Sequence, residues 1–307
     1  DKTKGLLNRI YEKLDGELIG INTAKKILDK GEGETFLIFI DHWAKNKKIQ
    51  NGFLSYVKKN NNITIISVHH AVWHVHEPAS IDPLHCEDIV LASNHWEADC
   101  KKIVKRREIT GCLRFSKPWL SIIDLQDKEE KIDHDKKKKI LVLSHSQKYT
   151  TDWNRMMNFL TTLAQRNDIN LRILPHVRGM SNLEPPKILK DSWDKNMTLD
   201  AAVKKSDIVL FWESSGIFEA VVRRKKVFFL SFLSERNGQF IWQEMASSKT
   251  IIQNELELFD ALDNYDNNKV PDNICFEKMI WPGTNDPWTN VSNFLDKLLN
   301  SNTKFNN

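Results

Sequence analysis

Seven short apolar runs, most of them uninterrupted by polar residues, constrain the fold of this chain more than any other feature. The runs occupy residues 36–40, 63–68, 88–92, 140–143, 171–174, 207–211 and 227–230. Strands covered on both faces have this pattern, and such strands belong to parallel sheets flanked by helices. The stretches between the runs are amphipathic, so the sequence predicts an α/β fold.

A charged stretch between the third and fourth runs divides the chain. It reads QDKEEKIDHDKKKK, is almost empty of large apolar residues, and is followed at once by a new strand run. We therefore predict an N-terminal domain over residues 1–130, a linker over 131–139 and a C-terminal domain over 140–307. Each half alternates strands and helices, so we expect two Rossmann-like domains facing a central cleft.

The last helix is predicted over residues 288–300, where apolar residues recur at helical spacing. The sequence leaves open whether this helix closes the second domain or packs back onto the first.

Composition excludes several classes of protein. The 307 residues carry a formal net charge of +4 and no basic, aromatic-interleaved motif, so nucleic-acid binding is not expected. No apolar run approaches the roughly 18 residues of a membrane span. Four cysteines without a CxxC pair disfavour a zinc site and a disulfide framework and indicate the cytoplasm. The basic run at residues 223–226 leaves phosphate binding, or association with the inner face of a membrane, open.

The segment SDIVLFWESSGIFEAVVRRKKVFFL, residues 206–230, carries the clearest candidate site. A strand turns into a helix at Ser214, Ser215 and Gly216, and such small residues leave backbone N–H groups free to face an anion such as phosphate. Glu219 follows in the first turn, where its carboxylate could accept hydrogen bonds from the hydroxyls of a sugar. A purely structural capping role is the alternative, but the spacing of Glu219 fits only a cap at Gly216, which has no side chain.

Two further strand ends of the C-terminal half carry polar residues. His176 and Arg178 follow the run at 171–174, and Ser144 follows the run at 140–143. Arginine holds phosphate through paired donors, and histidine can donate one hydrogen bond to it. We predict that all three residues join the donor site.

The order of these segments resembles the nucleotide-binding half of GT-B glycosyltransferases and their relatives. The relatives include non-hydrolysing nucleotide-sugar epimerases, CDP-glycerol glycerophosphotransferases and capsule-type Kdo transferases. EDIVLASNHWEADCKKIV and REITGCLRF, residues 87–104 and 107–115, are similar to the segment before the linker in that group. The resemblance implies that Ser214 and Ser215 meet the donor phosphate, Glu219 the nucleotide ribose, and His176 with Arg178 the phosphate or the nucleotide rim.

The N-terminal half concentrates titratable side chains, with eight of the ten histidines before residue 135. A general base is needed there for an inverting transfer, and Asp41 and His70, which follow strand runs, are the candidates. The residues predicted to bind the acceptor are His42, Trp43, His69, Trp73 and His74.

Metal binding is the less favoured interpretation of the histidines in the N-terminal half. His70 and His74 have the spacing of two ligands on one helix face, but the sequence lacks the His-Glu-x-x-His order. The pair Asp133 and Asp135 lies in the charged linker rather than at a strand end, so no required metal or other cofactor is expected.

The sequence thus predicts a glycosyltransferase that moves a sugar from a nucleotide-activated donor to a surface-polysaccharide or glycolipid acceptor. Glycerophosphate or polyol-phosphate transfer is the closest alternative chemistry. A transferase-like domain that binds glycan or nucleotide without catalysis is the alternative from another class.

Overall fold

The computed structural model describes residues 36–41, 63–68, 72, 88–100, 104, 106–127, 137–144, 152–176, 184–266, 271–283 and 285–301. The chain divides into two compact units. The first holds the N-terminal sheet together with the last helix, and the second consists of Ala71–Glu77 and Ile122–Asn285.

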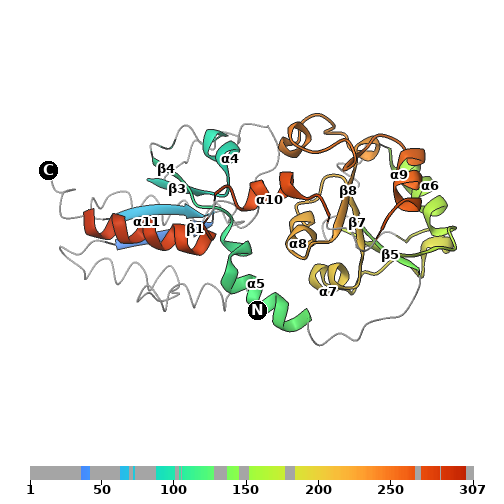
Figure 1. Ribbon diagram of the computed structural model, residues 1–307, viewed down its shortest axis with the longest axis horizontal. Coiled ribbons are helices and arrows are strands. Elements are labelled where there is room, and N and C mark those ends of the chain that lie inside the picture. Colours follow the sequence, from blue (N-terminus) through green and yellow to red (C-terminus); the bar gives the residue numbers. More distant parts are fainter. Residues whose placement is uncertain are drawn as a thin grey trace. The chain divides into compact units, whose positions relative to one another are not determined.

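The first sheet has four described strands, all parallel and in sequence order (Figure 1). They are β1 (Phe36–Asp41), β2 (Ile63–Val68), β3 (Ile89–Ala92) and β4 (Arg106–Ile109). The described helices that follow them are α4 (His95–Cys100), the 3-10 turn η1 (Leu113–Phe115) and α5 (Lys117–Asp127), the last of which continues into the second unit.

The last helix, α11 (Pro287–Ser301), completes the core of the first unit. One buried apolar cluster joins strand residues to helix residues: Ile66, Ile89, Leu91, Val291, Phe294, Leu295 and Leu298. The four helix members are spaced three, one and three residues apart, which places them on one face of the helix. Figure 1 shows α11 lying along the strands of this sheet.

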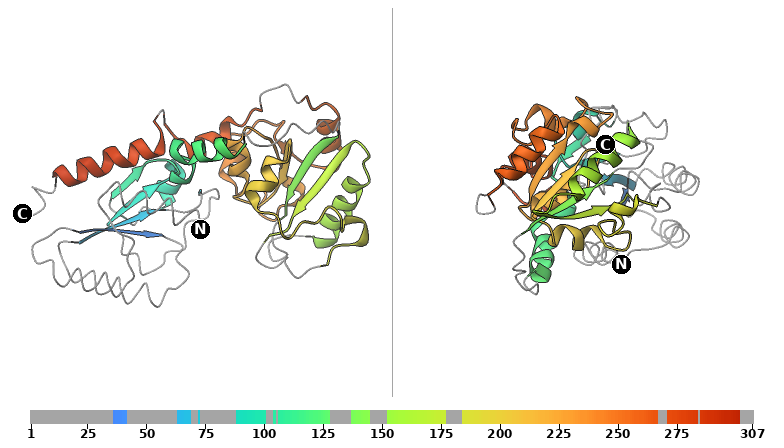
Figure 2. Two further views of the ribbon diagram at one scale, coloured as in Figure 1. Left: turned by 90° about the horizontal axis from the view of Figure 1, so that it is seen from below. Right: turned by 90° about the vertical axis from the view of Figure 1, so that its right-hand side faces the viewer.

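The second sheet has five parallel strands in the order β6-β5-β7-β8-β9. They are β5 (Lys138–Leu143), β6 (Ile169–Leu174), β7 (Ile208–Phe211), β8 (Lys226–Leu230) and β9 (Ile251–Ile252). The strands, coloured green to orange, lie side by side in Figure 2. The chain winds outward from β5 in both directions, so the strand order reverses between β5 and β7.

Five helices and three 3-10 turns are described in the second unit. The helices are α6 (Trp153–Ala164), α7 (Leu199–Lys204), α8 (Ile217–Val222), α9 (Glu255–Asp263) and α10 (Ile274–Ile280). The 3-10 turns are η3 (Lys187–Leu189), η4 (Ser231–Leu233) and η5 (Ile241–Glu244). No helix in the described ranges is both long enough and apolar enough to cross a membrane.

All seven apolar runs form strands, which confirms the predicted α/β class. Two strands were not predicted. β4 has the sequence RREI and carries no apolar run to predict it. An edge strand exposed on one side needs no such run. β9 has two residues, too few for a periodic pattern. Lys138 and Lys139, assigned from the sequence to the linker, already belong to β5.

The basic run at residues 223–226 does not form one continuous charged surface. Arg224 has a positive φ of 55° at the end of α8, and the N–H of Lys225 donates to the carbonyl of Ala220 at 3.0 Å, which closes the helix. The ammonium of Lys225 donates to the carbonyl of Lys204. Burial lowers the pKa of Lys226, whose ammonium lies over the ring of Phe228. The ammonium groups of Lys225 and Lys226 therefore contribute to the packing of the turn from α8 into β8.

Candidate functional site

The carboxyl ends of β5 and β7 mark the place where a sheet of this topology binds ligands. Parallel doubly wound sheets hold ligands beyond their carboxyl ends, at the point where the strand order reverses. In the second unit that point lies between β5 and β7. Ser144 directly follows β5, and Glu213, Ser214 and Ser215 follow β7. The predicted donor residues of these two strand ends are therefore brought to one edge of the sheet.

Ser144 ties the end of β5 to the end of β6. Its N–H and its Oγ both donate to the carbonyl of Leu174 at 3.2 Å, and the residue is buried. His176 lies two residues beyond Leu174 and is half-buried. A hydroxyl that donates to a carbonyl keeps acceptor lone pairs, so Ser144 in this geometry can accept a hydrogen bond from a ligand hydroxyl. Arg178 lies outside the described residues.

The turn from β7 into α8 is closed by its own hydrogen bonds. The N–H of Gly216 donates to Oγ of Ser214 at 3.2 Å, and the N–H of Ile217 to the carbonyl of Ser214 at 3.4 Å. The expectation that backbone N–H groups here are open to an anion is therefore wrong for Gly216, because the preceding hydroxyl takes its N–H. The half-buried side chains of Ser214 and Ser215 remain the polar groups of this turn.

Gly216 is the N-cap of α8, as the spacing of Glu219 predicts, and makes no side-chain cap bond. Its φ of −60° suits any residue, so the requirement for glycine is one of space. A Cβ added there would lie 3.1 Å from Cδ2 of Leu199 and 3.2 Å from Oγ of Ser214. A side chain at Gly216 would therefore require the side chains of Leu199 and Ser214 to shift by a few tenths of an ångström.

Glu219 is 4% exposed and belongs to a buried ion-pair network. Its Oε2 lies 3.1 Å from Nη1 of Arg223, one turn along α8. Nη2 of Arg223 pairs with Oδ1 of Asp200 on α7. This pairing fixes the position of the Glu219 carboxylate.

Glu213 is a residue of this edge that the sequence did not single out as a site member. It is 6% exposed, and its Oε1 accepts the hydroxyl of Ser234 at 3.0 Å and the N–H of Arg236 at 3.2 Å. Both partners lie in the loop after η4, so the carboxyl group joins the ends of β7 and β8. Burial raises the pKa of Glu213 above its ordinary value, despite the two hydrogen bonds.

We expect the free energy of unfolding to depend on pH through Glu213. A carboxyl group whose pKa is raised by folding stabilises the protein below its unfolded pKa, and this stabilisation is lost as pH rises through the folded value. Glu213→Gln keeps an oxygen that can accept from Ser234 and Arg236 and removes the buried charge. Urea unfolding at a series of pH values above 4.5, the ordinary pKa, should show a flatter pH dependence for this variant and equal or greater stability at pH 7.

Glu184→Gln is the matched control for that series, because Glu184 is an exposed glutamate of the same unit and lies outside the loop that holds the partners of Glu213. Its pH dependence should follow the wild type. Identical pH dependence of Glu213→Gln and wild type would show that Glu213 does not titrate as a buried acid.

The candidate residues of the N-terminal half lie largely outside the described residues. Asp41 is the last residue of β1, at the carboxyl edge of the first sheet, as predicted. The other predicted catalytic and acceptor residues are not described: His42, Trp43, His69, His70, Trp73 and His74. Their roles stay predictions. Within the described ranges, no group of three or more His, Cys, Asp or Glu side chains is placed to hold a metal ion.

A buried carboxylate also stands at the carboxyl end of β3. Oε2 of Glu97 accepts the N–H and the hydroxyl of Ser93 at 2.7 and 2.6 Å. The N–H of Glu97 in turn donates to Oδ1 of Asn94 at 2.9 Å. The arrangement is a reciprocal cap of α4, and it fixes the path of the chain as it leaves the edge of the first sheet.

Neither protein-family models nor curated protein sequences match this chain. Solved structures do match it. The UDP-GlcNAc 2-epimerase of Neisseria meningitidis bound to UDP-GlcNAc is 16% identical, with a TM-score of 0.54 over 91% of this chain and 80% of that one. The UDP-GlcNAc 2-epimerase of Methanocaldococcus jannaschii in complex with UDP-GlcNAc and UDP is 11% identical, with a TM-score of 0.53 over 90% and 79%.

A third match covers nearly the whole of both chains. A variant of the wall teichoic acid polymerase TagF, soaked with CDPG, is 12% identical, with a TM-score of 0.52 over 98% of this chain and 96% of that one. At such identities the likeness concerns the fold. The chain is similar in fold to these proteins, and each of its two units has the α/β architecture described above.

Proposed function

We propose that this protein is a glycosyltransferase that moves a sugar from a nucleotide-activated donor to a polysaccharide or glycolipid acceptor. The observation that carries the proposal is the gathering of Ser144, Ser214 and Ser215 at the carboxyl edge of the second sheet, where its strand order reverses. The fold adds support, because two of the similar structures hold UDP-GlcNAc.

In this proposal the second unit binds the donor. The hydroxyls of Ser214 and Ser215 donate to the donor phosphate, and the carboxylate of Glu219 accepts hydrogen bonds from the ribose hydroxyls. His176 and Arg178 contact the phosphate or the rim of the nucleotide. Donors aimed at the oxygen on which negative charge develops lower the barrier to departure of the phosphate. No metal is assigned to the reaction.

The N-terminal half of the chain supplies the general base and the acceptor site in this proposal. Asp41 or His70 removes the proton from the acceptor hydroxyl as its oxygen attacks the anomeric carbon. The bond between that carbon and the phosphate oxygen breaks, and the nucleotide leaves with the bonding electrons. His42, Trp43, His69, Trp73 and His74 contact the acceptor.

A binding screen tests the donor site. We expect one of CMP, CDP, UDP, GDP, ADP and TDP to raise the melting temperature of the wild type, because a ligand that binds only the folded state stabilises it by about 2.7 kcal/mol at 100 times its Kd. Ser215→Ala should reduce that shift, since a charge-assisted hydrogen bond is lost. Ser121→Ala, an exposed serine of the first unit, is the control and should keep the shift.

Absence of any shift in the wild type would contradict the proposed donor site. A shift that is equal in wild type and in Ser214→Ala and Ser215→Ala variants would place the nucleotide elsewhere. Each variant is compared with its own ligand-free melting temperature, so that a change in intrinsic stability is not counted as a change in binding.

The released nucleotide separates the alternatives. Sugar transfer from a nucleoside diphosphate sugar frees the nucleoside diphosphate, whereas glycerophosphate transfer from CDP-glycerol breaks the diphosphate bond and frees CMP. A CMP-sugar also frees CMP, so release of CMP is assigned by testing whether CDP-glycerol is the donor that is consumed. The glycerophosphate alternative draws on the TagF structure soaked with CDPG. A nucleotide that binds but is never released as product, in the presence of acceptors, would favour a domain that binds without catalysis.

A further inference from the structure

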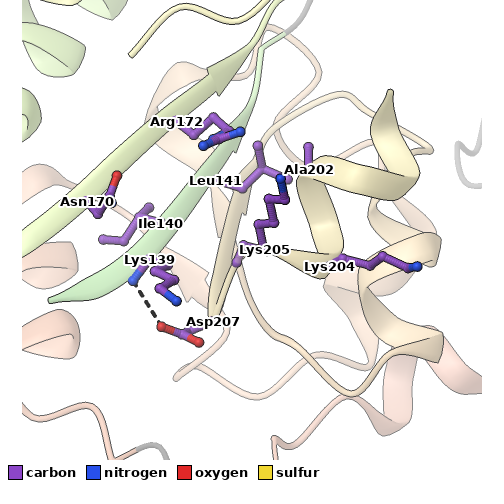
Figure 3. A pocket seen from close by; sticks show the side chains of 10 residues that line it. Lys139, Ile140, Leu141, Asn170, Arg172, Ala202, Lys204, Lys205 and Asp207 are labelled. Atoms are coloured by element: carbon purple, nitrogen blue, oxygen red, sulfur yellow. Dashed lines mark hydrogen bonds between the residues drawn. The ribbon is translucent and has the colours of Figure 1, made fainter. Parts of the chain in front are cut away.

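A hollow of about 540 Å³ lies on the second unit, away from the candidate donor site. It is lined by Lys139, Asn170, Arg172, Lys205 and Asp207, among others (Figure 3). Lys139 lies near the amino end of β5, and Asp207 directly precedes β7. The hollow therefore borders the amino ends of these strands, whereas Ser144, Ser214 and Ser215 follow their carboxyl ends.

The burial pattern of β6 explains why this face of the sheet is exposed at the hollow. Its residues alternate between buried and more exposed, unlike the wholly buried β7. Asn170 and Arg172 are two residues apart and so share one face, in register with Lys139 and Leu141 of β5. α7 has six residues and ends at Lys204. A helix of this length leaves this part of the face lined mainly by polar side chains, together with Ile140, Leu141 and Ala202.

The guanidinium of Arg172 is held in place at the hollow. Its Nη1 donates to Sδ of Met197 at 2.9 Å and lies 3.5 Å from Oδ2 of Asp194. Guanidinium has five N–H donors in a fixed fork, so donors remain beyond those used by these two contacts. An anchored guanidinium loses little conformational freedom when it binds an anion.

Lys205 faces the same hollow. Figure 3 shows its side chain extending along the hollow toward Arg172, while the side chain of Lys204 points away. Within the described part of the chain, the ammonium of Lys205 makes no hydrogen bond or ion pair. Asp207 is the one carboxylate of the lining, and its Oδ2 accepts the N–H of Lys139 at 3.0 Å. The lining therefore carries more positive than negative charge.

We propose that this hollow binds a multiply charged phosphate group, separately from the donor site. The fork of Arg172 matches two phosphate oxygens, Lys205 adds a point charge, and the amide of Asn170 can donate a further hydrogen bond. The proposal stands on the hollow and its charges and does not depend on the proposed transferase activity.

Titration calorimetry with pyrophosphate tests this site, and two adjacent lysines provide matched variants. We expect the wild type to bind pyrophosphate at about 50 mM NaCl and more weakly at about 300 mM, since salt screens exposed charges. Lys205→Gln should weaken binding about tenfold, as should Arg172→Gln, because each removes a hydrogen bond to a charged group. Lys204 also borders the hollow, but its side chain points away from Arg172 and Lys205, so Lys204→Gln should stay within about twofold of the wild type.

Pyrophosphate could also enter the candidate donor site, so Ser215→Ala is included, and it should keep the binding that Lys205→Gln and Arg172→Gln weaken. Loss of binding in Ser215→Ala, with retention in the Lys205→Gln and Arg172→Gln variants, would overturn the proposal. Absence of wild-type binding at millimolar pyrophosphate would overturn it as well. Lys205→Gln alters no protein contact in the described part of the chain, so its ligand-free melting temperature should match the wild type.

Discussion

Arg223→Ala is expected to lower the free energy of unfolding by about 3–5 kcal/mol, because it leaves a buried charge without its partner. The side chain of Arg223 is 3% exposed and that of Glu219 is 6% exposed. Nη1 of Arg223 lies 3.1 Å from the carboxylate of Glu219 and also donates to the Glu219 carbonyl at 3.3 Å. Nη2 pairs with Asp200. Urea unfolding followed by circular dichroism at constant pH measures the loss.

Arg224→Ala is the matched control, because Arg224 is the next residue, is exposed, and carries the same charge. Its effect should stay within about 0.5 kcal/mol. Adding Glu219→Gln to Arg223→Ala should recover part of the loss, since no uncompensated carboxylate is then buried. A loss below about 1 kcal/mol in Arg223→Ala would show that the pair behaves as a solvated surface pair.

Trp242→Ala should cost about 3–5 kcal/mol of stability by opening a cavity in the core of the second unit. Trp242 is fully buried in η5. Its ring stacks on Phe240 with centroids 4.5 Å apart and an interplanar angle of 12°. It also meets the rings of Phe211, Phe229 and Phe276 at 5.6 to 5.7 Å. Four aromatic neighbours that belong to strands and helices cannot all move into the vacated space.

Trp242→Phe should lose less than Trp242→Ala, because a ring still fills much of the volume. Trp153→Ala serves as the control, since Trp153 is half-buried at the start of α6 and its removal opens no enclosed cavity. Unfolding is best followed by far-ultraviolet circular dichroism, because each variant changes the tryptophan fluorescence. Equal losses in Trp242→Ala and Trp153→Ala would contradict the role given to this cluster.

The strands of both sheets could be predicted because each buried strand carries a continuous apolar run. The run at residues 207–211, for example, becomes β7 with every residue buried. β4 could not be predicted, because three of its four positions are occupied by Arg106, Arg107 and Glu108. Its parallel pairing with β3 comes from the neighbouring strand rather than from its own sequence.

The parts of the candidate site that residues adjacent in the sequence form could be predicted. The parts that depend on residues distant in the sequence could not. The turn at Ser214 and the cap at Gly216 follow from adjacent small residues. The burial of Glu213 depends on Ser234 and Arg236, which lie more than twenty residues away and meet it only in the folded unit. The burial of Glu219 likewise depends on Arg223, which in the sequence belongs to a basic run typical of a surface.

The order in which the chain is synthesised determines when α11 can pack against the first sheet. The sheet cluster of Ile66, Ile89 and Leu91 is covered by Phe294 and its helix neighbours. Residues 122–285, most of the second unit, are synthesised between these two parts. The second unit can therefore finish packing on emergence, while the first sheet awaits its helix. During synthesis a chaperone would therefore bind the nascent chain at the exposed apolar face of this sheet.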